Sequence, residues 1–265
     1  GAPVSVLHRG AAFRSSRTEV LEFCASLGPA DWRMDSRAEG WSIHDVVAHM
    51  AAGAHALFGP AAVKMMRGND IERLNDEMVA DRRSWPAARV LAEFRRWTGA
   101  FAAVVGPAGR TRLGGVELPL AELGRFPIRL LLSALTFDTY THLHHDMAPA
   151  LGRTLPNPDA NRMAVTVEWM MAVLSNQLRL GRPGWLDRPV LITLTGPGGG
   201  DWLVGPDGAL PSTAADSAVA QVRAAALGFP EWGTKRADWR VREVDVDVDG
   251  DTDYAAALLD WVNIV

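Results

Sequence analysis

The chain has little cysteine and no long apolar run. Cys24 is the single cysteine in 265 residues, so no internal disulfide can form, and this usage is typical of a reducing compartment. No stretch reaches the roughly 18 consecutive apolar residues of a transmembrane helix, and the first residues lack the basic-then-apolar order of a signal peptide. We therefore expect a cytoplasmic protein without a membrane partner.

An excess of basic residues is also absent. Lys and Arg number 27 against 31 Asp and Glu, which gives a net charge of −4, and the sequence contains no basic stripe. This balance argues against nucleic acid as a partner and leaves small molecules as the expected ligands. The hydrophobic share of 48% is enough for a sizeable core, and the length suits two modest domains.

The first half of the chain carries apolar residues at helical spacing. Ser42, followed by Asp45 three residues later, resembles a capping box, and Pro86 suits the first turn of another helix. Four long helices are predicted, over 12–27, from 43 onward, over 86–105 and over 128–151. Four helices with one long connection indicate a four-helix bundle.

Past Gly184 the pattern changes to shorter segments that mix strands and helices. We predict a helix over 161–180, a strand–turn–strand over 189–204, a helix over 214–227, a strand over 239–248 and a helix over 254–262. The predicted fold class is mainly α with α+β. Its expected parts are a helical bundle in residues 1–155, a connecting helix in 156–184 and a small α+β domain in 185–265.

One segment of the fourth predicted helix concentrates polar side chains. Asp138 and His142 are four residues apart and therefore share a helix face, which His145 and Asp146 continue one turn further. The helix is otherwise mostly apolar, and burying an unpaired carboxylate costs several kcal/mol. The spacing therefore predicts that this face is paired or holds a metal ion.

The second predicted helix offers a further ligand, His49, on or beside its apolar face. Two imidazoles and one carboxylate are a common set of three metal ligands that leaves positions open for water or substrate. Zinc in such a site acts as a Lewis acid and lowers the pKa of a bound water or thiol. The alternative is structural: the histidine is then a satisfied core residue, and the Asp–His cluster is a buried hydrogen-bond network.

Two adjacent arginines, Arg82 and Arg83, precede the third long helix. They can meet an anionic substrate, but solvated surface charges are the commoner role of such a pair.

Two segments resemble the signatures of a known family. Residues 41–51 (WSIHDVVAHMA) and the later Asp138…His142…Asp146 pattern are similar to those of the mycothiol-dependent maleylpyruvate isomerase family, within the DinB-like metal-dependent bundles. The C-terminal unit is similar to that family's sterol-carrier-like second domain. The resemblance covers nearly the whole chain, and its specific parts are the two signatures.

The resemblance implies a function and cofactors. By position, it makes His49, Asp138 and His142 the ligands of a divalent metal ion, with zinc as the first choice, and mycothiol the thiol cosubstrate. The activated thiolate would add to an activated double bond or displace a leaving group of a small organic substrate. The implied protein is a mycothiol-dependent isomerase or S-transferase, which we expect to be a monomer or homodimer.

The chain departs from the family pattern in two ways. Asp138 stands where the family has glutamate, which shortens the ligand arm by one methylene. Asp146 follows His142 by four residues where the family has three, so His145 remains an alternative to His142 as the last ligand. With these departures, another thiol conjugate is as good a candidate substrate as maleylpyruvate.

Two other functions fit the same residues. A metal-dependent hydrolase or lyase would use a metal-bound hydroxide as nucleophile and would turn over without a thiol. A non-catalytic protein would instead hold a small apolar ligand in its C-terminal unit, and the Asp–His cluster would be structural.

Overall fold

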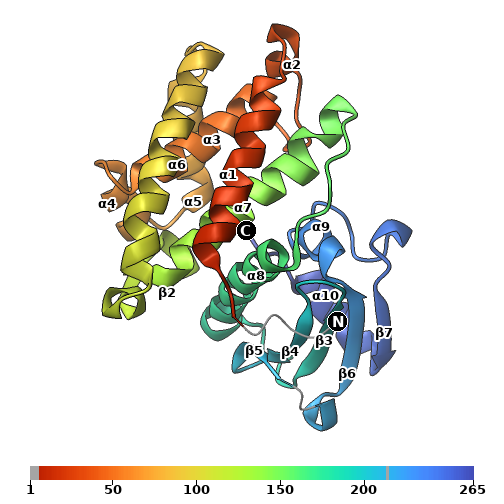
Figure 1. The fold of residues 1–265 in the computed structure, drawn as a ribbon. Coiled ribbons are helices and arrows are strands. Elements are labelled where there is room, and N and C mark those ends of the chain that lie inside the picture. The colour runs from red at the N-terminus through yellow and green to blue at the C-terminus, as the bar shows by residue number, and fades with distance from the viewer. Residues whose placement is uncertain (1–5, 213–214) are drawn as a thin grey trace. The chain divides into compact units, whose positions relative to one another are not determined.

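The computed structural model describes residues 6–212 and 215–265, and its internal contacts divide the chain into two compact units (Figure 1). The helical unit is Arg9–Pro156. The α/β unit combines Asn157–Val265 with the described part of the first eight residues.

Seven α-helices build the helical unit, all of whose residues are described. They are α1 (Arg9–Ala25), α2 (Pro29–Arg33), α3 (Ile43–Ala56), α4 (Ala61–Arg67), α5 (Ile71–Arg82), α6 (Ala87–Gly109) and α7 (Leu131–Thr141). The long helices α1, α3, α6 and α7 pack along one another as a bundle. The predicted mainly α layout with a four-helix bundle is confirmed for this unit.

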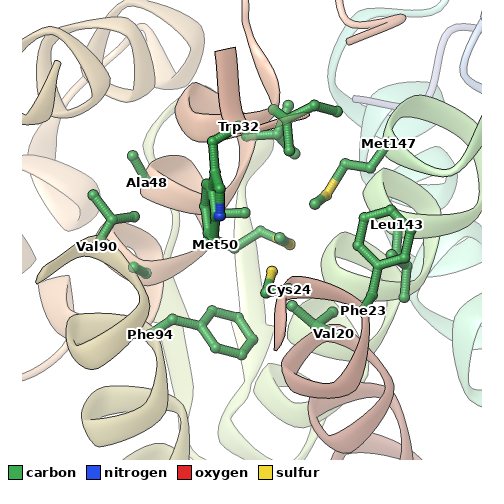
Figure 2. Packing of buried hydrophobic residues seen from close by; sticks show 14 of the residues in the cluster. Val20, Phe23, Cys24, Trp32, Ala48, Met50, Val90, Phe94, Leu143 and Met147 are labelled. Atoms are coloured by element: carbon green, nitrogen blue, oxygen red, sulfur yellow. The ribbon is translucent and has the colours of Figure 1, made fainter. Parts of the chain in front are cut away.

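The apolar faces of these helices meet in a common core. Figure 2 shows one cluster of side chains from α1, α2, α3, α6 and the segment after α7, among them Cys24, Trp32, Met50 and Phe94. Each large apolar side chain that is fully buried contributes about 1.5–3 kcal/mol. Cys24 is a small core residue of this cluster, and burial raises the pKa of its thiol to about 12.

The capping box predicted at the start of α3 is present. Ser42 Oγ accepts a hydrogen bond from Asp45 N at 3.1 Å, and Asp45 Oδ2 accepts one from Ser42 N at 3.1 Å. Two otherwise unpaired donors of the first turn are thereby satisfied, which starts the helix at Ile43.

The helix predicted over 128–151 is not one continuous α-helix. A short antiparallel hairpin, β1 (Glu117–Pro119) and β2 (Arg125–Pro127), leads into it through a 3₁₀ turn. After α7 the chain continues as a π-helical turn (His142–Met147) and a 3₁₀ turn (Pro149–Leu151). In the π turn, Ala148 N donates to Leu143 O, five residues earlier, at 3.0 Å.

The α/β unit contains a five-stranded mixed sheet and three α-helices in its described residues. The strands are β3 (Val190–Thr195), β4 (Gly200–Gly205), β5 (Gly208–Pro211), β6 (Ala220–Ala225) and β7 (Asp247–Gly250), in the order β5-β4-β3-β6-β7. Only the β3–β6 pair is parallel within this sheet. The helices are α8 (Ala160–Gly181), α9 (Phe229–Gly233) and α10 (Thr252–Trp261). This unit completes the predicted α+β layout.

Two predicted elements of this unit are wrong. The helix over 214–227 is replaced by β6, which pairs with β3, while residues 213–214 lie outside the described part. The strand over 239–248 shrinks to β7, preceded by a 3₁₀ turn at Arg242–Val244. The helix expected as a connector, α8, packs against β5 and groups with the sheet, while the expected domain limits stay a prediction.

No single helix in the described part of the chain combines the length and apolar composition needed to cross a membrane. The helices α3 and α4 meet that requirement only together, and they are bent by 89° relative to each other.

Candidate metal centre

The structure brings together His49 of α3, Asp138 of α7 and His142 of the π turn. Asp138 Oδ1 lies 3.0 Å from His49 Nε2 and 3.3 Å from His142 Nε2. One nitrogen or oxygen from each side chain lies within 4.8 Å of the others, and no other described group of His, Cys, Asp or Glu is arranged in this way. Two imidazoles and one carboxylate at this separation are a set of donors that suits a divalent metal ion.

The two imidazoles control the charge of Asp138. Burial of this carboxyl group opposes its ionisation, but attraction and hydrogen bonds from His49 and His142 outweigh that effect. The pKa of Asp138 therefore lies far below its usual range, and the carboxylate is charged. An ionised carboxylate is the form that binds a metal ion.

His142 is held between two carboxylates. Its Nδ1 lies 2.7 Å from Asp146 Oδ2, and its Nε2 faces Asp138. Burial alone would lower the pKa of His142, but attraction to Asp138 and hydrogen bonds to both carboxylates raise it to about 9. Without a metal ion, the His142 ring is therefore protonated on both nitrogens at neutral pH and carries a positive charge.

The Asp146 carboxylate also sets the orientation of the His142 ring. Both carboxylates can only accept a hydrogen bond, and the contact with Asp146 is the shorter, so the neutral ring keeps its proton on Nδ1 and its lone pair on Nε2. This histidine–carboxylate arrangement is the usual outer support of a metal-bound imidazole. His49 lacks such support among the described residues, since its Nδ1 is buried without a hydrogen-bond partner.

A proline and contacts from a distant loop account for the π turn that carries His142. Pro149 has no backbone N–H, so it cannot donate to the carbonyl of His145 four residues earlier. The Arg37 guanidinium donates to this carbonyl at 3.2 Å, and Arg37 N donates to Asp146 O at 2.9 Å. The loop before α3 thereby replaces the α-helical hydrogen bonds that the chain loses here.

The same loop places Trp41 against the candidate ligands. The centroid of the Trp41 ring lies 5.0 Å from that of His49 and 6.3 Å from that of His142. Ser36 Oγ donates to Trp41 O at 2.7 Å, which fixes the loop backbone at this point. The indole therefore covers one side of both imidazoles.

Two further histidines of the same segment, the alternative ligand His145 and its neighbour His144, lie outside this group. The His145 ring packs edge-on against Tyr140, with the centroids 6.0 Å apart. His144 Nε2 lies 2.6 Å from Glu19 Oε1, on a different side of the helix. The structure thus brings His142, and not His145, to His49 and Asp138.

Arg82 is not the solvated surface charge that is the commoner role of such an arginine. It is 13% exposed and donates from Nε to Glu93 Oε1 at 2.7 Å and from Nη2 to Glu93 Oε2 at 3.0 Å. His55 Nδ1 shares the same carboxylate at 3.0 Å. Arg82 is therefore half of a buried ion pair that joins α5 to α6. Arg83 is 54% exposed and lies 3.5 Å from Asp45 Oδ1.

Three residues that support the candidate ligands, Asp146, Trp41 and Arg37, could hardly be recognised from the sequence. The four-residue spacing of His142 and Asp146 placed them on one face, but it did not indicate that one orients the other. Trp41 lies directly before the helix cap in the sequence, but this position does not indicate that its ring contacts His49 and His142. The hydrogen bonds of Arg37 span more than one hundred residues of sequence, and no local pattern reports them.

The helical unit is similar to a domain of known proteins. The sequence profile of the mycothiol maleylpyruvate isomerase N-terminal domain matches residues 13–144, which include all three candidate ligands. No curated protein sequence matches the chain significantly.

Two solved structures share the fold, those of the mycothiol-dependent maleylpyruvate isomerase and of a histidine-to-alanine variant of that enzyme. Each is 14% identical to this chain, with a TM-score of 0.56 over 86% of this chain and 88% of the other. At this identity, the match shows the fold alone. The profile match shows that the helical unit of this chain belongs to the family of mycothiol maleylpyruvate isomerase N-terminal domains.

Proposed function

We propose that this protein is a metal-dependent enzyme that uses mycothiol to isomerise a small organic substrate or to transfer the thiol to it. The observation that carries the proposal is the convergence of His49, Asp138 and His142, whose donor atoms lie within 4.8 Å of one another. Membership of the family supports mycothiol as the thiol.

The donor set fits a divalent metal ion. Asp138 is ionised, and the proton that His142 holds in the metal-free site is the one that a bound cation would replace. Zinc is the proposed ion, since it combines imidazole and carboxylate ligands and needs only three from the protein in a catalytic site. When bound, the ion would supply Lewis acidity that lowers the pKa of a thiol at its open positions and so provides the thiolate nucleophile.

The chain's own residues would hold and shield this centre. Asp146 keeps the proton of His142 on Nδ1, so that Nε2 can bind the ion. Trp41 covers one side of both imidazoles and leaves the thiol and the substrate to approach from elsewhere. Although Asp138 has a shorter arm than the family's glutamate, its Oδ1 reaches both imidazoles.

The test is thiol-dependent turnover of the metal-loaded protein. Maleylpyruvate and other activated double-bond substrates should react only when mycothiol is present, and His142→Ala should abolish this activity. His145→Ala, in the same π turn but outside the group of ligands, is the matched control and should keep it.

Two results would contradict the proposal. Full activity after the metal is stripped would exclude a metal-dependent step. Equal turnover without any thiol would instead favour a hydrolase or lyase that uses the same centre.

A further inference from the structure

A pocket of about 630 Å³ lies in the helical unit, and none of the three candidate metal ligands lines it. Its walls come from α2 and the residues just before it, the start of α3 and the segment between α5 and α6. His44, which lines it, is five residues before His49 on α3, so the two side chains project about 140° apart around the helix. The pocket therefore opens on a different side of α3 from the candidate metal centre.

The charged side chains of this pocket are cationic. Arg33 and Arg83 line it, and no acidic residue is among the described lining residues. Arg33 is exposed, and its side chain makes no ion pair or hydrogen bond within the described part of the chain. Arg83 has one nearby carboxylate, Asp45, at 3.5 Å, and that carboxylate also caps α3 through Ser42 N. The positive charge of Arg33 is thus not balanced by a carboxylate, and that of Arg83 is balanced only in part. This excess of positive charge favours binding of an anion in the pocket.

Apolar side chains form the rest of the wall. Trp32 is 8% exposed and anchored in the core cluster (Figure 2), so its position is fixed before any ligand arrives. Trp85 is held from two directions: the Arg89 guanidinium lies 3.7 Å from its ring centroid, and Trp85 O receives a hydrogen bond from His44 Nε2 at 2.8 Å. Leu27 and Pro29 add further apolar surface. A preformed apolar wall with a small number of polar groups is typical of a site that binds a small molecule.

We propose that this pocket binds a small acid with a flat apolar body, such as an aromatic carboxylate, independently of the metal centre. The ring lies against Trp32, Trp85 and the apolar rim. The carboxylate pairs with Arg33 and Arg83, whose planar guanidinium groups match its geometry. The site takes no part in the proposed thiol chemistry, so it remains if that proposal fails.

Isothermal titration with naphthalene-2-carboxylate tests the site, and naphthalene-2-carboxamide serves as the uncharged ligand of the same shape. The acid should bind and the amide should not. The double variant Arg33→Gln/Arg83→Gln should weaken binding of the acid by about tenfold or more, since it removes both charged partners. Arg67→Gln, an exposed arginine at the end of α4, is the matched control and should bind like the wild type.

Two outcomes would overturn the proposal. The first is binding that is equal for the acid and the amide, or unchanged in the double variant. The second is binding that is lost in His142→Ala but kept in the double variant, which would place the acid at the metal centre instead. Both arginines are exposed, so the double variant should fold, and a circular dichroism spectrum of His142→Ala must show an intact fold before its binding is compared.

Discussion

Replacement of Asp146 by asparagine tests whether this buried carboxylate orients a metal ligand. The Asp146 side chain is 2% exposed, and its Oδ2 lies 2.7 Å from His142 Nδ1. The carboxylate accepts but cannot donate, so it keeps the proton on Nδ1 and the lone pair on Nε2. An asparagine amide offers both a donor and an acceptor, so it no longer selects the tautomer that binds a metal ion.

We expect Asp146→Asn to weaken metal affinity by about 10- to 100-fold, the usual effect of removing the outer partner of a metal-bound histidine. This loss corresponds to about 1.4–2.8 kcal/mol. Titration of the metal-free protein with Zn²⁺ against a competing chelator measures it. Asp76→Asn, at an exposed position of α5, removes the same charge elsewhere in the helical unit and should leave the affinity unchanged.

If Asp146→Asn binds Zn²⁺ as tightly as the wild type while its circular dichroism spectrum shows an intact fold, Asp146 does not orient a metal ligand. His142→Ala sets the scale for this comparison, because it removes the ligand itself and should lose more affinity than Asp146→Asn.

Three further predictions follow from the buried groups of the helical unit. Because burial raises the pKa of Cys24 to about 12, iodoacetamide should label this thiol only after unfolding, and stoichiometric labelling of the native protein would contradict its placement. The pKa of His142 is raised from 6.5 to about 9, so its charge stabilises the metal-free fold below pH 6.5, and this contribution is lost as the pH rises through 9. Urea unfolding below pH 6.5 and above pH 9 should show that the metal-free wild type loses more stability with rising pH than His142→Gln does. Equal losses would argue against a raised pKa of His142. Glu93→Ala leaves Arg82 buried without its partner and should cost about 3–5 kcal/mol of unfolding free energy in urea titrations, whereas a change below about 1 kcal/mol would mean that the pair contributes little.

The bundle was predictable because its helices are amphipathic and locally capped. The apolar spacing of α1, α3 and α6, and the Ser42–Asp45 cap, depend on neighbours in the sequence. The grouping of Asp138 with His142 follows from the same helical geometry. The addition of His49 rested on its place beside the apolar face of a second helix, and the resemblance to a family supported it.

The errors arise where distant contacts decide the local structure. Residues 220–225 (AQVRAA) are rich in helix-forming alanine, yet they form β6 because parallel pairing with β3 satisfies their backbone. The π turn at His142–Met147 depends on Arg37, which lies far away in the sequence. Arg82 looked like a surface charge because its partner, Glu93, belongs to the next helix.

The metal content of the purified protein tests the central claim most directly. Elemental mass spectrometry should find about one metal ion per chain in the wild type and in His145→Ala, and none in His49→Ala, Asp138→Ala and His142→Ala. A wild-type protein without metal after purification and Zn²⁺ loading would contradict the account. So would metal that is retained in His142→Ala and lost in His145→Ala.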